Sequence, residues 1–215
     1  MNDQDLRQDV IDELSFEPSI DDADIGVAVE NGIVTLSGHV ASYAEKITAE
    51  RATQRVKGVR GIAQEIEVRF PSDSKTADDQ IAERAIDVLD WNVIVPSENI
   101  QVKVEKGWVT LSGQVNWNFQ KTGAENSVRK LTGVKGVANL IEVTPKFLAA
   151  DVKSSIEKAL KRNAEVEIKG IQVRVDGNKV TLEGRVHSWP ERDAAQHAAW
   201  SVPGVTWVKD NLVVS

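Results

Sequence analysis

The stretch Val34-Thr35-Leu36-Ser37-Gly38, VTLSG, decides the fold because the chain repeats it. The same five residues return unchanged at 109–113, and the close variant VTLEG stands at 180–184. The surrounding positions keep the same spacing, with an offset of 75 residues from the first copy to the second and of 71 to the third. No gap is needed inside any copy. A chain of 215 residues with this register is built of three tandem repeats.

Working outward from the repeated phrase, each copy predicts a helix followed by a hairpin. In the first copy, Leu6, Val10 and Leu14 are four residues apart, which is typical of one buried face of a helix. The alternating segment 25–30 predicts a strand, and Asn31-Gly32 predicts the tight turn that leads into VTLSG. The repeated phrase is therefore the second strand of a hairpin.

A second helix and a third strand complete each copy. Ser42 and Glu45 have the spacing of a capping box, as do Ser188 and Glu191, and this pattern predicts a helix start. We expect two sets of structural glycines. Those that close the repeated phrase should let the chain leave the sheet, and they are Gly38, Gly113 and Gly184. Those that end the second helix should adopt the left-handed conformation, and they are Gly58, Gly133 and Gly204.

The fold class that follows is α+β, with three tandem αββαβ modules. A strand, helix and strand in succession form a crossover that leaves the two strands parallel, so each module should have a three-stranded mixed sheet with two helices on one face. We expect the modules at residues 1–70, 76–145 and 148–215, with a separate sheet in each. Each unit buries only a modest core.

Charge and composition limit the function. The net charge is −7, and residues 1–70 account for it, with 14 acidic and 7 basic side chains. This balance lacks the basic footprint of a nucleic-acid-binding protein. The chain has no cysteine, and its first residues do not have the pattern of a secretory signal. We expect a cytoplasmic protein as the sequence is written, or a periplasmic one if a processed form is given.

No pattern indicates an enzyme, a cofactor or a metal site. The three histidines, His39, His187 and His197, occupy different positions within their copies. The acidic segment 21–24 lacks the ligand spacing and the glycine of a calcium-binding loop, so we interpret it as a solvated loop. We expect no catalytic residue, no cofactor and no metal ligand.

The repeated pattern resembles the BON domain, named for bacterial osmotically induced and nodulation proteins. The resemblance is carried by the segments GIVTLSGHV at 32–40, GWVTLSGQV at 107–115 and NKVTLEGRV at 178–186, and by the terminal GV-x-x-V elements. It covers nearly the whole chain. It implies a non-enzymatic domain associated with phospholipid or membrane binding, envelope integrity and osmotic stress, often in secreted or periplasmic proteins.

All six tryptophans lie in the second and third copies. Trp91, Trp117 and Trp189 are candidates for interfacial anchors, because an indole suits a surface that is partly apolar and partly wet. Packing in the core or between copies is the alternative, and we favour it. The bases that close the first helix of the third copy are either favourable charges at a helix C-terminus or a lipid headgroup site, and they are Lys158, Lys161 and Arg162.

The alternation of the strands also predicts what the helix-free face of each sheet displays. Ile33, Trp108 and Leu140 should point there, with Trp108 beside Leu140, and we expect another copy, another chain or a ligand to cover them. The third copy shows a polar set on this face, including Gln172 and Lys179.

Two functional hypotheses follow. The first is a non-catalytic binding module that contacts a phospholipid membrane or envelope and stress proteins during osmotic or envelope stress. The second is a chaperone-like or structural protein-interaction module without lipid binding. The oligomeric state stays open.

Overall fold

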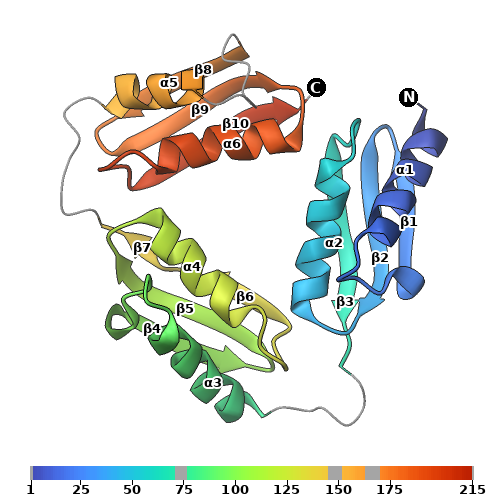
Figure 1. Cartoon of the computed structure of the whole chain (residues 1–215), viewed down its shortest axis with the longest axis horizontal. Helices are drawn as coiled ribbons and strands as arrows, with labels where there is room; N and C mark the ends of the chain where they lie inside the picture. The colour runs from blue at the N-terminus through green and yellow to red at the C-terminus, as the bar shows by residue number, and fades with distance from the viewer. Residues whose placement is uncertain (1, 71–76, 145–151, 163–169, 215) are drawn as a thin grey trace. The chain divides into compact units, whose positions relative to one another are not determined.

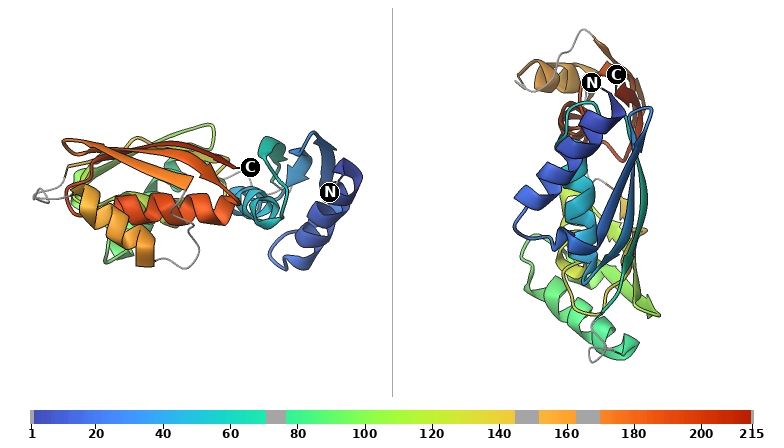
Figure 2. Two further views of the ribbon diagram at one scale, coloured as in Figure 1. Left: turned by 90° about the horizontal axis from the view of Figure 1, so that it is seen from above. Right: turned by 90° about the vertical axis from the view of Figure 1, so that its right-hand side faces the viewer.

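The computed structural model describes residues 2–70, 77–144, 152–162 and 170–214. It contains three αββαβ modules, each with its own sheet (Figure 1). Among the described strands, none pairs with a strand of another copy, and the predicted fold class is confirmed. Within each module the two long helices lie side by side on one face of the sheet, as Figure 2 shows for the third module in its left-hand view.

The elements follow the same order in every copy. The first module consists of α1 (Asp3–Phe16), η1 (Asp22–Asp24), β1 (Ile25–Glu30), β2 (Ile33–Val40), α2 (Tyr43–Arg55) and β3 (Gly61–Val68). The second consists of α3 (Asp78–Trp91), η2 (Ser97–Asn99), β4 (Ile100–Glu105), β5 (Trp108–Val115), α4 (Asn118–Val128), β6 (Gly136–Asn139) and β7 (Glu142–Val143). The third consists of α5 (Val152–Arg162), β8 (Ile171–Asp176), β9 (Lys179–Val186), α6 (Trp189–Trp200) and β10 (Trp207–Val214).

The repeated phrase forms the middle strand of each sheet. In the first module β1 pairs antiparallel with β2, and β3 pairs parallel with β2 on its other side. The inward residues of VTLSG, Val34 and Leu36, have no exposed surface and pack beneath the helices. The helix residues that meet them are buried as the four-residue spacing predicts, and they are Leu6, Val10 and Leu14.

The glycine that ends the phrase has a different role from the expected one. β2 continues through Gly38 to Val40, so the chain does not leave the sheet at this position. Gly38 has φ +103, and a side chain there would overlap the carbonyl oxygen of Asp24, which precedes β1. Gly113 and Gly184 meet the same close backbone approach. Glycine is therefore required where the start of the first strand presses against the second.

The helix ends agree with their sequence signals. The Ser42 side chain accepts the N–H of Glu45 at 3.2 Å, and the Glu45 carboxylate accepts the N–H of Ala41 at 3.4 Å. The glycines after the second helix all have left-handed φ angles, and they are Gly58 (+96°), Gly133 (+96°) and Gly204 (+98°).

Three equivalent positions on the second helix and the third strand carry a trio of polar side chains in each module. At equivalent positions the trio contains one base, one carboxylate and one amide. The members are Lys46, Glu50 and Gln64 in the first module, Lys121, Glu125 and Asn139 in the second, and Arg192, Gln196 and Asp210 in the third. In the third module the acid and the amide have exchanged places between helix and strand. The acid and the amide are bonded in the second and third modules, whereas the Gln64 Nε2 atom of the first module is buried without a hydrogen-bond partner.

Candidate interaction surfaces

The end of α3 and the loop that follows it present three apolar side chains to solvent. Trp91 is 86% exposed, Val93 is 98% exposed and Ile94 is 47% exposed. We call these three residues the loop patch. A large apolar area without cover is unusual on a monomeric soluble protein, so the loop patch is a candidate interaction surface.

Hydrogen bonds hold the backbone of this loop in place. The Asn92 side chain donates an N–H to the Ser127 hydroxyl at 2.9 Å. The backbone carbonyl of Asn92 accepts the N–H of Val95, also at 2.9 Å. Val95 is buried, and Ile94 lies against Gly123, where an added Cβ would be 3.2 Å from the Ile94 Cδ1 atom. The patch is therefore anchored on α4, and its exposure follows from the fold of the loop.

The equivalent positions of the other copies are less apolar. The first copy has Phe16, Pro18 and Ser19 where the loop patch has Trp91, Val93 and Ile94. The third copy replaces the tryptophan with Arg162. The loop patch is thus a property of the second module.

A second apolar surface lies at the start of α4. Trp117 is 37% exposed and Phe119 is 54% exposed, and their rings stack with centroids 6.2 Å apart. Of the tryptophans predicted as anchors, Trp91 and Trp117 are therefore available to a partner. Trp189 is half-buried, and the Arg192 guanidinium lies over its ring at 4.9 Å, so this tryptophan already has a contact within its own module.

The basic cluster of the third module is also exposed. Lys158, Lys161 and Arg162 occupy the last turns of α5, and all three lie in solvent. The equivalent positions of the second module carry Asp87, Asp90 and Trp91. The same end of the first helix is therefore acidic and aromatic in one copy and basic in the next.

The helix-free sheet faces carry the remaining candidates. Ile33 is 50% exposed, Trp108 is 56% exposed and Leu140 is 64% exposed, so half or more of each residue is open to solvent. Trp108 and Leu140 share a face but are not neighbours. Trp108 pairs with Gly136, and Leu140 lies four residues farther along the edge of the sheet, at roughly 13 Å. Coverage by another copy, another chain or a ligand stays a prediction.

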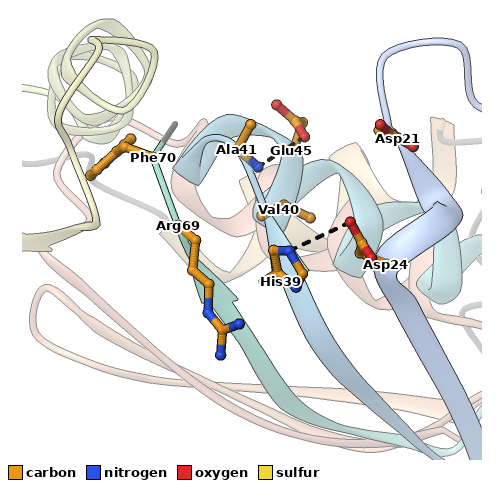
Figure 3. A pocket seen from close by; sticks show the side chains of 8 residues that line it. All are labelled: Asp21, Asp24, His39, Val40, Ala41, Glu45, Arg69 and Phe70. Atoms are coloured by element: carbon orange, nitrogen blue, oxygen red, sulfur yellow. Dashed lines mark hydrogen bonds and ion pairs between the residues drawn. The ribbon is translucent and has the colours of Figure 1, made fainter. Parts of the chain in front are cut away.

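A pocket of about 300 Å³ lies at the end of the first sheet (Figure 3). His39 Nε2 is 3.5 Å from an Asp24 carboxylate oxygen, and the Glu45 carboxylate is engaged in the cap of α2. The second and third copies have Gln114 and Arg185 at the position of His39. Two carboxylates of this pocket thus have partners within it, and the pairing of His39 with Asp24 belongs to this module.

The described residues contain neither a membrane-spanning helix nor a cluster of metal ligands. Among the described residues, no helix combines the length and apolar character that crossing a bilayer requires. Over the same ranges, no three His, Asp or Glu side chains converge in a way that could hold a metal ion.

Comparisons with known proteins agree with the repeat. The family model of the BON domain matches the chain three times, over residues 2–69, 77–145 and 149–215. The chain is 30% identical over 148 residues to osmotically-inducible protein Y of Escherichia coli (strain K12), an alignment that covers 65% of this chain and 71% of that protein.

Two solved structures of CdsD, a structural protein of the type III secretion system of Chlamydia trachomatis, also match. They are 14% and 15% identical to this chain and cover 98% and 100% of it. The matches extend over 92% and 100% of the two CdsD chains, and the TM-score is 0.27 in each case.

Proposed function

The chain belongs to the BON domain family, and on this basis we propose that it is a non-enzymatic binding protein that associates with phospholipid surfaces in osmotic or envelope stress. The observation that carries the proposal is the loop patch on the second module. Its three apolar side chains are exposed at the end of α3 and on the loop after it, and hydrogen bonds fix the backbone of that loop.

The chemistry of the patch suits a membrane interface. Tryptophan is enriched at the boundary between lipid headgroups and acyl chains, where its ring is half in an apolar medium. Burial of Trp91 would remove about 150 Å² from water, which corresponds to about 4 kcal/mol before the costs of association. Trp117 and Phe119 offer further apolar area on the same module.

The charges near the patch determine what kind of lipid contact is expected. Asp87 and Asp90 precede Trp91 in the last turn of α3, and that turn contains no base. Attraction to anionic lipid therefore has to come from elsewhere, and Lys158, Lys161 and Arg162 on α5 are its best source. We assign apolar insertion to the second module and electrostatic attraction to the third.

Vesicle co-sedimentation of the full chain tests this division. We expect Trp91→Ala with Val93→Ala to reduce binding several-fold to both neutral phosphatidylcholine and anionic phosphatidylglycerol vesicles. Ile86→Ala is the matched control, because Ile86 is an exposed apolar residue on α3 outside the loop patch. The double variant should fold normally, since both side chains lie in solvent.

A second double variant tests the basic cluster in the same experiment. Lys158→Gln with Lys161→Gln should weaken binding to anionic vesicles at low salt and leave binding to neutral vesicles unchanged. If the unaltered chain pellets with neither kind of vesicle, a protein partner without lipid contact becomes the better account of the loop patch.

The proposal includes a periplasmic location for the protein. The family resemblance implies an envelope setting, so we favour the periplasmic alternative over the cytoplasmic one. Cell fractionation, with a cytoplasmic marker enzyme as reference, tests the location directly.

A further inference from the structure

Each module displays one bulky apolar side chain at the same place on its open face, the sheet face that its helices do not cover. In the first two modules this residue is on the middle strand, where Ile33 pairs with Gly61 and Trp108 pairs with Gly136. In the third module the bulky residue is on the edge strand instead, where Trp207 pairs with Lys179 of the middle strand. Trp207 is 46% exposed, so this face is not purely polar, contrary to the sequence-based expectation.

Apart from Ile33, the open face of the first module is low and acidic. Next to the row of Ile33, the register aligns Ala28, Thr35 and Ala63 across the three strands. These short side chains leave a low surface that another sheet could approach closely. The charged residues on this face are three carboxylates and one guanidinium, namely Glu30, Glu65, Glu67 and Arg69.

The open face of the third module is its complement in shape and charge. Trp207 projects near the hairpin end, and the next row contains Arg174, Thr181 and Lys209. The charged residues on this face are four bases and two acids, namely Arg174, Lys179, Arg185, Lys209, Asp176 and Glu183. A low acidic face and a basic face with a projecting indole are suited to bind each other.

We propose that the open face of the first module binds the open face of the third module of a second copy of this chain. In this arrangement Trp207 of one chain lies on the small side chains around Ala28 and Ala63 of the other. The contact joins two different surfaces, so two chains can associate reciprocally or several can join end to end.

The size of the faces determines the strength of the contact. Three strands of about eight residues span roughly 15 by 26 Å, which is about 400 Å² per face. A stable complex usually buries about 800 Å² on each partner, so a single contact of this kind is weak. Charge attraction supplies much of its specificity, and high salt should weaken it.

Sedimentation velocity of the full chain tests the proposal. We expect the sedimentation coefficient to rise with protein concentration at low salt and to lose this dependence at high salt. Trp207→Ala should shift the association to concentrations several-fold higher. Circular dichroism confirms that each variant keeps its secondary structure.

Charge reversal then identifies the two faces. Glu30→Lys with Glu65→Lys makes the acidic face basic, and Lys179→Glu with Lys209→Glu makes the basic face acidic. Each variant alone should stay monomeric, while an equimolar mixture of the two should associate, because each chain then offers what the other lacks. A wild-type chain that stays monomeric at every concentration at low salt would overturn the proposal. A mixture that does not associate would overturn it as well.

Discussion

Asp3, at the start of α1, holds the turn at Gly32 by accepting its backbone N–H at 3.0 Å. The same carboxylate accepts the N–H of Asn31 at 2.7 Å, so one side chain satisfies both central residues of the hairpin turn. Asp78 does the same in the second module for Lys106 at 2.7 Å and Gly107 at 2.9 Å. The first helix is thereby fixed to a hairpin 28 residues away. At the equivalent position the third copy has Ala149, which lies outside the described residues.

Removal of this carboxylate should loosen the hairpin. We expect Asp78→Ala to lower the free energy of unfolding of the second module by about 1–3 kcal/mol, because two charge-assisted hydrogen bonds are lost. Asp79→Ala is the matched control, since it also removes an acid from the first turn of α3 but no bond to the turn. Urea unfolding of the two variants measures the difference. Equal losses would show that only the helix-terminal charge matters.

The glycine that closes the repeated phrase should tolerate no side chain. Gly184 has φ +132, and a Cβ there would overlap the carbonyl oxygen of Gly170. Gly184→Ala should therefore destabilise the third module by more than about 3 kcal/mol. Gly177, in the turn of the same module, has φ +58 with open space around it, so Gly177→Ala should cost only about 1 kcal/mol. Thermal unfolding of both variants tests the order of the two effects.

The polar trio should accept an exchange of its acid and amide. In the third module the Arg192 and Gln196 side chains both donate to one oxygen of Asp210. Asp210→Asn leaves the partly buried Arg192 without its counter-charge and should cost about 1–3 kcal/mol. Addition of Gln196→Glu should restore most of this loss, because Glu125 and Asn139 have that arrangement in the second module, with a hydrogen bond of 3.1 Å. A double-mutant cycle with no coupling between the two sites would contradict this.

Arg55 links the two helices of the first module and should affect its behaviour in acid. It donates to Glu13 at 2.8 Å and to Glu17 at 3.2 Å. Hydrogen bonds from Ser19 and Arg55 hold the pKa of Glu17 below its ordinary value of 4.5. Because this pKa is lower in the folded state, the stabilisation is present above pH 4.5 and is lost as the pH falls through the folded value. Arg55→Gln should raise the pKa of Glu17, which an NMR titration of its carboxyl carbon measures; an unchanged pKa would exclude Arg55 as a cause.

The order of elements could be predicted from the sequence because the hairpin turns and two of the helix starts have local signals that the repeat extends to every copy. The turn at Asn31-Gly32 and the cap at Ser42 depend on residues within four positions of each other. The bond from Asp3 to Gly32 could not be predicted in this way, since only the folded module brings the two together. An aspartate does recur at the equivalent position, Asp78, and this repetition was the one sign in the sequence that the residue has a structural role.

The surfaces were less predictable than the fold. Trp91 was a candidate from its residue type, but the exposure of Val93 depends on how Asn92 holds the loop. Trp207 was missed because it aligns with Gly61 and Gly136, and only the pairing with Lys179 shows that it takes over the role of Trp108. An apolar residue that stands on the neighbouring strand in one copy is not detected when only equivalent sequence positions are compared.

Quenching of tryptophan fluorescence by brominated phospholipids tests the central claim, that the loop patch enters the lipid surface. Brominated acyl chains quench only tryptophans that reach them. With neutral vesicles, we expect strong quenching of the wild-type chain, and Trp91→Phe should keep vesicle binding while a large part of the quenching disappears. Binding that persists with the quenching unchanged in Trp91→Phe would show that another surface meets the lipid, and would contradict the account.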